Sequence, residues 1–354
     1  MSSRPRLTPA IADVRRAVRE ALAVMPDAPG RAGGLVLVAL SGGADSLALT
    51  AATAFEAPRA GLRAGAVVVD HGLQTGSADV AACAAGQARE LGLDPVVVKT
   101  VVVGAEGGPE AAARAARYAA LVEAATELGA AAVLLGHTLD DQAETVLLGI
   151  ARGSGAASLQ GMAAVSSVPA VAGARAGTVY LRPLLGIRRA TTLQACRDAG
   201  LEPWHDPQNS DPAFARVRVR ETVLPLLEAE LGPGIAEALA RTAEQAREDT
   251  EALDHFADEQ VEELADHAEA GISLSVKGLE HNPAALRQRI IRLAVSAEFG
   301  VSLSRAQTLE VARLVTDWHG QGPLDLPGIR VVRQGALLVF SARDRGSNEG
   351  IPPA

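Results

Sequence analysis

The sequence predicts an α/β protein in which a Rossmann-like parallel sheet, with helices on both faces, occupies the first two hundred residues. Short continuous runs of Val, Leu and Ala alternate there with alanine-rich stretches at helical spacing. Such runs are typical of strands buried on both faces, as in a parallel sheet covered by helices. The chain is also 354 residues long, which is long for one core, so we expect two or three domains.

The elements of this sheet follow in order. Thr8-Pro9 is typical of a helix start, with Thr8 as the N-cap and Pro9 as the first helical residue. Residues 153–177 are rich in Gly, Ala and Ser and indicate a loop. The expected strands lie at 35–40, 65–70, 95–103, 131–136 and 178–182, and the expected helices at 45–56, 77–91, 109–128, 140–151 and 186–200.

A different pattern begins at residue 216. Helical periodicity extends to about residue 269, and a mixed pattern follows, with a strand near 272–276, helices near 283–299 and 304–316, and a strand pair near 329–340. We therefore expect an N-terminal amphipathic helix (1–30), the α/β domain (31–215), a helical linker domain (216–270), a small α+β domain (271–346) and a disordered tail (347–354).

The net charge and the lengths of the apolar segments exclude some classes of protein. The net charge of −9 argues against a generally basic nucleic-acid binder, but residues 226–354 hold 21 acidic and 12 basic side chains and so account for all of it. The first 225 residues can therefore still bind phosphates through local arginine clusters. No segment has the ~20 uninterrupted apolar residues of a membrane span. Because the N-terminus does not resemble a signal peptide either, we expect a cytoplasmic protein.

A small turn after the first strand is the most specific motif. It consists of Ser41-Gly42-Gly43-Ala44-Asp45-Ser46 and leads into an alanine-rich helix. In this geometry backbone N–H groups and a helix N-terminus cradle a phosphate. Because the chain has only two lysines, Lys99 and Lys277, the GxxxxGK(S/T) pattern of a kinase-type P-loop is excluded. The alternative is a tight turn in which Asp45 is an ordinary helix cap.

Three carboxylates gather after a later strand. On a helix, Asp140 and Asp141 share one face with Glu144. The alternative is structural, because Thr138 and Asp141 have the spacing of a capping box. Their position favours a site: segments 41–46, Asp70-His71-Gly72 and 136–144 all follow strands, and ligands of a parallel sheet lie beyond the carboxyl ends of its strands.

Two arginines on the expected helix at 109–128 are candidates for anion binding. Arg114 and Arg117 project together at i, i+3, and their guanidinium groups suit phosphate or carboxylate groups. The alternative is a solvated arginine face on which Glu110 pairs with Arg114.

A second arginine group follows a turn-rich loop. Arg216, Arg218 and Arg220 alternate in sequence and are typical of an exposed strip that lies along a phosphate backbone. The alternative is a helix start with charged flanks. A shared basic region is favoured by four arginines upstream, Arg182, Arg188, Arg189 and Arg197.

In order and spacing, these segments resemble the tRNA(Ile)-lysidine synthetases of the PP-loop, or N-type ATP pyrophosphatase, superfamily. The resemblance covers residues 34–225 firmly and the remainder in its general plan. One departure is Arg216-Val217-Arg218, where the family more often has Arg-Asn-Arg. The segments that match are Ser41–Ser46, Val69–Leu73, Ala113–Tyr118, Gly136–Thr145, Arg152–Gly155, Arg182–Leu185 and Asp206–Arg220.

The resemblance implies that residues 31–215 are an ATP pyrophosphatase catalytic domain. In the family's reaction ATP activates the C2 oxygen of the wobble cytidine of tRNA(Ile), in the anticodon CAU. PPi leaves, and free L-lysine attacks C2 of the adenylated cytidine to give lysidine, with the base flipped out of its loop. A homodimer is left open. The implied assignments are Ser41, Gly42, Gly43, Ala44, Asp45, Ser46, Asp70 and His71 to ATP; Asp45 to Mg²⁺; Asp45, Arg117, Asp140, Asp141 and Glu144 to catalysis and lysine binding; and Arg152, Arg182, Arg216, Arg218 and Arg220 to tRNA.

Three other functions compete with this one. A tRNA thiolase with the same loop typically needs paired cysteines, which Cys83 and Cys196 do not provide. A small-molecule amidoligase needs no tRNA-binding extension, so the regions after residue 216 count against it. A nucleotide-binding regulatory protein would have a degenerate site, whereas this chain has a complete set of carboxylates and arginines.

Overall fold

The computed structural model describes residues 7–25, 33–72, 76–104, 108–153, 156–167, 179–206, 210–268 and 271–343. The chain divides into two compact units, residues 1–246 and 247–354. The finer domain boundaries expected from the sequence stay predictions, and the expected tail at 347–354 lies outside the described residues. Within the described ranges, no helix is long and apolar enough to cross a membrane.

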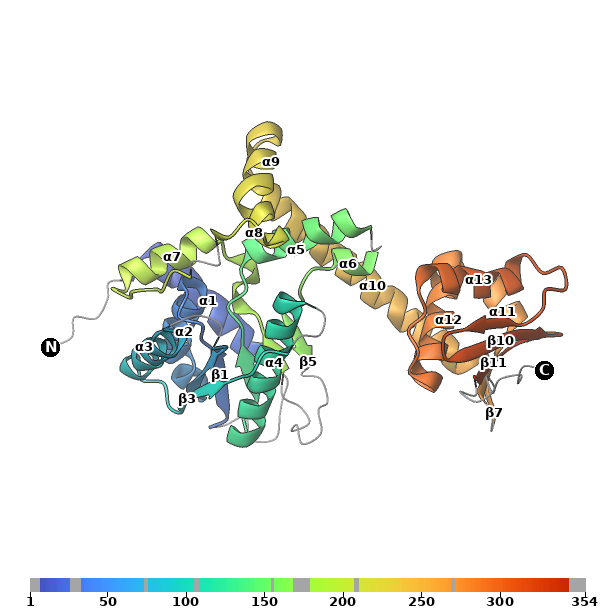
Figure 1. The fold of residues 1–354 in the computed structure, drawn as a ribbon, viewed down its shortest axis with the longest axis horizontal. Coiled ribbons are helices and arrows are strands. Elements are labelled where there is room, and N and C mark those ends of the chain that lie inside the picture. The colour runs from blue at the N-terminus through green and yellow to red at the C-terminus, as the bar shows by residue number, and fades with distance from the viewer. Residues whose placement is uncertain are drawn as a thin grey trace, which may run out of the picture. The chain divides into compact units, whose positions relative to one another are not determined.

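In the described residues, the first unit is built on a six-stranded sheet in the order β3-β2-β1-β4-β6-β5. Figure 1 labels β1, β3 and β5 of this sheet and the helices α1 to α4 of the same unit. All strand pairs are parallel except β5 with β6, at one edge. The chain runs from β1 outward to β3 and returns on the other side of β1 with β4. The ligand crevice of such a sheet lies at this reversal. The strands are β1 (Leu35–Ala39), β2 (Arg63–Asp70), β3 (Val96–Thr100), β4 (Ala132–Leu134), β5 (Val165–Ser167) and β6 (Val179–Leu181).

Helices cover both faces of this sheet, which confirms the predicted fold class. Val36 and Val38 of β1 pack into one core and Leu35 and Leu37 into the other. Because neighbouring residues of a strand point to opposite faces, a single apolar run supplies both cores. The first face carries α1 (Pro9–Ala23), α2 (Ala44–Glu56), α3 (Ser77–Glu90) and α7 (Arg189–Asp198), and the second carries α4 (Pro109–Leu128).

The segment expected to be a loop contains regular structure. Its described part includes α6 (Ala156–Leu159) and β5. Ser166 of β5 pairs with Tyr180 of β6, so a tertiary contact rather than a local pattern creates this short strand. The other elements of this part of the chain are η1 (Pro58–Ala60), α5 (Leu139–Arg152) and η2 (Pro183–Gly186).

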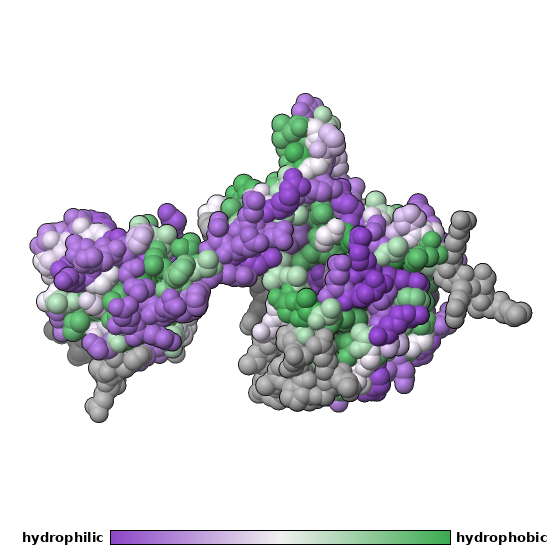
Figure 2. Space-filling model, turned by 180° about the vertical axis from the view of Figure 1, so that it is seen from behind, coloured by the Kyte–Doolittle hydropathy of each residue, from purple (hydrophilic) through white to green (hydrophobic). Residues whose placement is uncertain are grey.

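A helical segment follows the sheet. α8 (Ala215–Arg218) continues through a π-helical turn, η4 (Val219–Val223), into α9 (Leu224–Leu231), and α10 (Ile235–Leu264) crosses the boundary between the two units. The exposed side of α10 is hydrophilic in Figure 2, in keeping with the acidic residues concentrated in its sequence. The projecting helix α9 carries hydrophobic surface in the same view.

The described residues of the second unit form a five-stranded antiparallel sheet, in the order β7-β8-β11-β10-β9, packed against helices. Phe340, Leu338 and Ile290 are fully buried in its core. The helix expected to reach residue 269 ends at Leu264, because the next four residues pair with β8. The elements are β7 (Ala265–Ala268), β8 (Gly271–Ser275), α11 (Val276–His281), α12 (Ala284–Phe299), α13 (Arg305–Thr316), β9 (Leu324–Leu326), β10 (Ile329–Gln334) and β11 (Leu337–Ala342).

Candidate active site

The turn between β1 and α2 has the backbone of an anion cradle. Gly42 has a φ of +83°, which residues with a Cβ rarely adopt. The hydroxyl of Ser46 donates to the carbonyl of Gly43 (2.9 Å) and accepts from the N–H of Ser41 (3.2 Å), so it closes the turn. α2 begins at Ala44, and the first N–H groups of a helix have no partner within it. The turn can therefore hold a phosphate without a lysine.

A second loop lies against this turn. It follows β4, the neighbour of β1, and contains Gly136. A Cβ at Gly136 would lie 3.1 Å from both N and Cα of Ser46, so a side chain there would push the two backbones apart. The starts of α2 and α5 thus lie together at the reversal in strand order.

Asp141 is both a helix cap and a carboxylate of this site. Its Oδ2 accepts from the N–H of Thr138 (2.8 Å), as part of a capping box at the start of α5. Its Oδ1 accepts from Nη2 of Arg189 (2.9 Å). Burial alone would raise the pKa of Asp141, but Arg189, Thr138 and Arg216 outweigh burial and hold the pKa below its usual value. The group is therefore ionised at neutral pH.

Glu144 is fully buried and holds three guanidinium groups. Its oxygens accept from Nη1 of Arg189 (3.2 Å), Nε of Arg216 (2.8 Å) and Nε of Arg220 (2.8 Å). A carboxylate removed from water is stable only when it is paired in this way. Glu144 is therefore the centre of the ion-pair network.

Arg216, Arg218 and Arg220 do not form the exposed strip expected from the sequence. They lie on α8 and η4, so the helical repeat brings Arg216 and Arg220 to one face, where both bind Glu144. Arg218 instead donates to two backbone carbonyls of the preceding loop, at 2.7 and 2.8 Å. The alternating arginines are compatible with a strand and with a helix. The helix brings Arg216 and Arg220 to one face, where both can pair with Glu144, and the local sequence does not reveal this partner.

The first turn of α7 contacts the other carboxylates. Asp45, at the start of α2, accepts from the hydroxyl of Thr192 and lies 3.5 Å from Nε of Arg189. Burial raises the pKa of Asp45 despite these two partners. Asp140 accepts from the N–H of Arg189 (2.7 Å) and pairs with Arg188 (3.2 Å). From the sequence, Arg189 is only one member of a basic region and Thr192 is not predicted, although their i, i+3 spacing at a helix start is a usable signal.

A cavity of about 260 Å³ lies beside these carboxylates. Its walls combine charged side chains with apolar ones, so it suits a ligand with a charged head and an aliphatic stem. The charged walls are Asp140, Glu144, Arg188, Arg189, Arg220 and Glu228, and the apolar walls are Leu224, Pro225 and Ala236.

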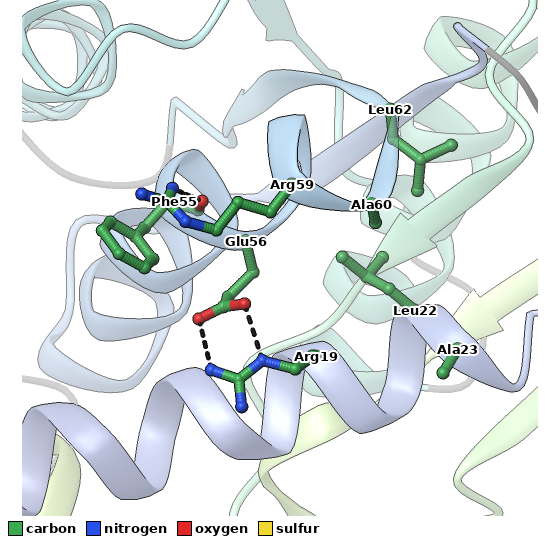
Figure 3. A pocket seen from close by; sticks show the side chains of 8 residues that line it. All are labelled: Arg19, Leu22, Ala23, Phe55, Glu56, Arg59, Ala60 and Leu62. Atoms are coloured by element: carbon green, nitrogen blue, oxygen red, sulfur yellow. Dashed lines mark hydrogen bonds and ion pairs between the residues drawn. The ribbon is translucent and has the colours of Figure 1, made fainter.

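A larger cavity, of about 520 Å³, lies at the other end of α2 (Figure 3). Arg19 of α1 donates to Glu56 of α2 through two hydrogen bonds of 2.9 Å, and the guanidinium groups of Arg15 and Arg59 lie over the ring of Phe55. The 13 residues of α2 span about 20 Å at ~1.5 Å per residue, so this cavity is far from the phosphate-binding turn. These contacts fasten α1 to α2, and we assign no chemistry to the cavity.

Cationic side chains gather where α4 meets the ends of β2 and β4. This cationic cluster consists of Arg114, Arg117 and Arg182, and His71 and His137 lie beside it. Arg117 forms no ion pair among the described residues, and burial together with the charge of Arg114 holds its pKa below the usual value. Burial, with the charges of Arg182 and Arg117, lowers the pKa of His137 to about 3. Nδ1 of His137 and Nδ1 of His71 are buried without a hydrogen-bond partner in the described part of the chain. In the described residues, Arg117 thus lacks a counter-ion, and two buried imidazole nitrogens lack hydrogen-bond partners. This combination indicates a site for an anion.

The other predicted site residues have local partners or stand apart. Asp70 is buried and accepts from the N–H of Gly72 (3.0 Å). Arg182 donates to Ser166 (2.9 Å) and to a backbone carbonyl (2.8 Å). Arg152 is exposed in the last turn of α5, at the opposite end of that helix from the carboxylates.

Known proteins match both units of the chain. A profile of the PP-loop domain matches residues 15–227, and a profile of the TilS substrate binding domain matches residues 274–337. The chain is 66% identical to the tRNA(Ile)-lysidine synthase of Leifsonia xyli over 309 residues, which cover 87% of this chain and 90% of the relative. The chain belongs to the tRNA(Ile)-lysidine synthase family. Identity is 53% to the Thermobifida fusca member, over 94% of this chain and 98% of that one, and 46% to the Mycobacterium bovis member, over 95% of each.

A solved structure outside the family shares the fold. It is the U34-tRNA thiolase NcsA from Methanococcus maripaludis with its 4Fe-4S cluster, with a TM-score of 0.53 and 20% identity over 67% of this chain and 79% of that one. At this identity the likeness concerns the fold alone. Membership of the lysidine synthase family, whose members are ATP-using PP-loop ligases, favours a ligase over a thiolase.

Proposed function

We propose that this chain joins L-lysine to C2 of the wobble cytidine in the CAU anticodon of tRNA(Ile). ATP first adenylates the C2 oxygen of the cytidine, and PPi leaves. The amine of lysine then attacks C2, AMP departs with the oxygen, and the product is lysidine. One observation carries the proposal: in a member of the lysidine synthase family, a phosphate-binding turn lies directly beside a cluster of carboxylates that suits an ammonium group.

The turn from Ser41 to Ser46 is proposed to bind the triphosphate. Backbone N–H groups at the start of α2 would donate to phosphate oxygens, and the conformation of Gly42 keeps the turn open to them. We place Mg²⁺ at Asp45, because this residue belongs to the turn that is proposed to bind the triphosphate, and Mg²⁺ commonly combines one or two carboxylates with phosphate oxygens. When bound, Mg²⁺ neutralises charge on the departing PPi. Asp70 and His71 remain predicted ATP-binding residues.

Asp141 and Glu144 are the proposed partners of a lysine ammonium group, and Glu144 and Asp140 line the 260 Å³ cavity. Ionised carboxylates only accept hydrogen bonds and an ammonium group only donates them, so the two are complementary. Leu224 and Pro225 form an apolar wall against which the aliphatic stem can pack. Because the attacking amine must be neutral, one of the carboxylates is expected to take its proton.

The cationic cluster around Arg117 is proposed to bind a phosphate of the adenylate or of the tRNA. His137 is expected to stay neutral there and to offer its free Nδ1 as a hydrogen-bonding atom. Arg152, Arg182 and Arg218 remain predicted tRNA contacts, whereas Arg216 and Arg220 are proposed to act through Glu144. The match of residues 274–337 to a substrate binding domain supports a further tRNA contact in the second unit.

Two expectations stay predictions. A homodimer is compatible with the proposal, and the oligomeric state in solution would test it. A cytoplasmic location is expected because ATP, free lysine and newly made tRNA are all present there.

Transfer of isotope-labelled lysine tests the proposed function. The purified chain should incorporate the label into tRNA(Ile) with a CAU anticodon, and should release one PPi for each lysine transferred. Omission of ATP, or replacement of the wobble cytidine by uridine, should abolish the transfer. PPi release with a small-molecule acceptor and no tRNA would support an amidoligase, and sulfur transfer to the tRNA would support a thiolase. Either result would contradict the proposal.

A further inference from the structure

The side chain of Arg189 occupies the centre of the carboxylate cluster. Its three nitrogens each face a different carboxylate: Nε lies 3.5 Å from Asp45, Nη2 lies 2.9 Å from Asp141 and Nη1 lies 3.2 Å from Glu144. These carboxylates come from the starts of α2 and α5. A guanidinium group is a planar cation with donors on every nitrogen, so this single side chain can contact all three carboxylates at once.

The charges around this position balance only while Arg189 is in place. The three carboxylates carry −3, and the arginines bound to them, Arg189, Arg216 and Arg220, carry +3. Without Arg189 the cluster would have a net charge of −1, which one ammonium group neutralises. Two cations cannot occupy the same position, because like charges a few ångströms apart repel each other strongly near a protein surface.

Only the side chain of Arg189 has to move for this exchange. Its backbone is fixed at the start of α7, where its N–H donates to Asp140 (2.7 Å) and its carbonyl accepts from Thr192 (2.8 Å). The side chain itself is 27% exposed and lines the 260 Å³ cavity. Glu144 would keep Arg216 and Arg220 as partners after the exchange, so it would not be left as an unpaired buried charge.

We propose that Arg189 is an internal competitor of lysine: its guanidinium group fills the position that the lysine ammonium group would take, and lysine binds by displacing the guanidinium group from the carboxylates toward solvent. This inference rests on the proposed function. Arg189 is a positioning residue, since it holds the carboxylates in place until the substrate cation arrives. Its presence makes lysine binding weaker than an unoccupied cluster would allow.

The test is the affinity for L-lysine, measured by calorimetry on the full chain without ATP or tRNA. Arg189→Gln removes the competing charge and keeps hydrogen-bonding atoms, so we expect lysine to bind about tenfold more tightly or better, a change of ~1.4 kcal/mol. The matched control is Arg16→Gln, an exposed arginine of α1 that pairs with Asp13 and lies outside the candidate site. This control should change the affinity by less than about twofold.

A second measurement separates competition from a general loss of structure. In Arg189→Ala, added methylguanidinium should refill the vacated position and weaken lysine binding several-fold, whereas it should have little effect on the wild-type chain. Equal or weaker lysine binding by Arg189→Gln, or no effect of methylguanidinium on Arg189→Ala, would overturn the inference. If the wild-type chain and every variant fail to bind lysine, the proposed function itself is contradicted.

Discussion

At the scale of single residues, a buried glutamate organises the candidate site. Glu144 lies on α5 and binds Arg189 of α7 and two arginines of the continuous segment α8–η4. It therefore joins three parts of the chain that are far apart in sequence: α5, α7 and this segment. An ion pair of this kind contributes little net stability over an apolar core, but removal of one partner leaves buried charge behind. Glu144 therefore sets both the local structure and the local charge balance of the candidate site.

Glu144→Gln should destabilise the chain and weaken lysine binding together. Three guanidinium groups lose their shared counter-ion, which we expect to lower the free energy of unfolding by ~3–5 kcal/mol. Urea denaturation and lysine calorimetry measure the two effects. The control is Glu127→Gln, which removes an exposed partner of Lys99 and should cost less than ~1 kcal/mol. A stability loss no larger than that of the control would contradict the central position of Glu144.

His137 should make stability depend on pH. The pKa of His137 is about 3 in the folded chain against an ordinary value of 6.5. Between these values the unfolded chain binds more protons, so the free energy of unfolding should fall as the pH falls through this window. His137→Asn removes the effect. Between about pH 7 and about pH 5, the variant should lose less stability than the wild type, by on the order of 1 kcal/mol. Parallel losses in the two proteins would show that His137 protonates normally when folded.

The candidate residues could be predicted from the sequence where a local pattern carried the signal. Asp45 and Asp141 follow strands, and their positions at helix starts were readable from spacing alone. The partners of Arg216 and Arg220 could not be predicted, because a residue 72 or 76 positions away determines which helical face they use. Thr192 was not predicted, and the local signal for it is its i, i+3 spacing from Arg189 at the start of a helix.

At the scale of elements, the turn from Ser41 to Ser46 depends on one backbone conformation. Gly42 has a φ of +83°, and the nearest atom to a Cβ built there would be Cβ of Ala84 at 3.5 Å. A Cβ at position 42 therefore has enough space. A substitution of Gly42 would destabilise the chain through backbone strain and not through a steric clash. The turn and the start of α2 form one unit, because the hydroxyl of Ser46 bonds both of its sides.

Gly42→Ala should lower stability by ~1–2 kcal/mol and weaken ATP binding, because the turn relaxes away from the conformation that holds phosphate. The matched control is Gly86→Ala in α3, where nothing lies within 4 Å of the new Cβ. The same substitution there should stabilise the chain by up to ~1 kcal/mol. Urea denaturation and ATP titration distinguish the two variants. Unchanged ATP affinity in Gly42→Ala would show that the turn is not the phosphate site.

Most elements of the sheet were predictable because their residues face two cores. The run from Leu35 to Ala39 supplies side chains to both faces of the sheet. Every position in this run is therefore apolar, and the strand is visible in the sequence as a continuous apolar stretch. β5 and β7 were not predictable, because each exists through pairing with a neighbouring strand. Such short edge strands carry no periodic pattern of their own.

At the scale of the whole molecule, the chain has two compact units with separate cores. The first contains the turn from Ser41 to Ser46, the carboxylate cluster and the cavity beside it, and matches the PP-loop domain. The second has its own antiparallel sheet and matches a substrate binding domain. The net negative charge of the chain is confined to residues 226–354. Whole-chain charge therefore did not predict the cationic cluster of the first unit.

Nucleoside mass spectrometry tests the central claim most directly. Transcribed tRNA(Ile) with a CAU anticodon is incubated with the full chain, ATP, Mg²⁺ and L-lysine, and is then digested to nucleosides. We expect the wobble cytidine to gain the mass of one lysine residue, and expect no gain without ATP or with Glu144→Gln. An unmodified wobble cytidine after complete ATP turnover, or a modification elsewhere in the tRNA, would contradict the account.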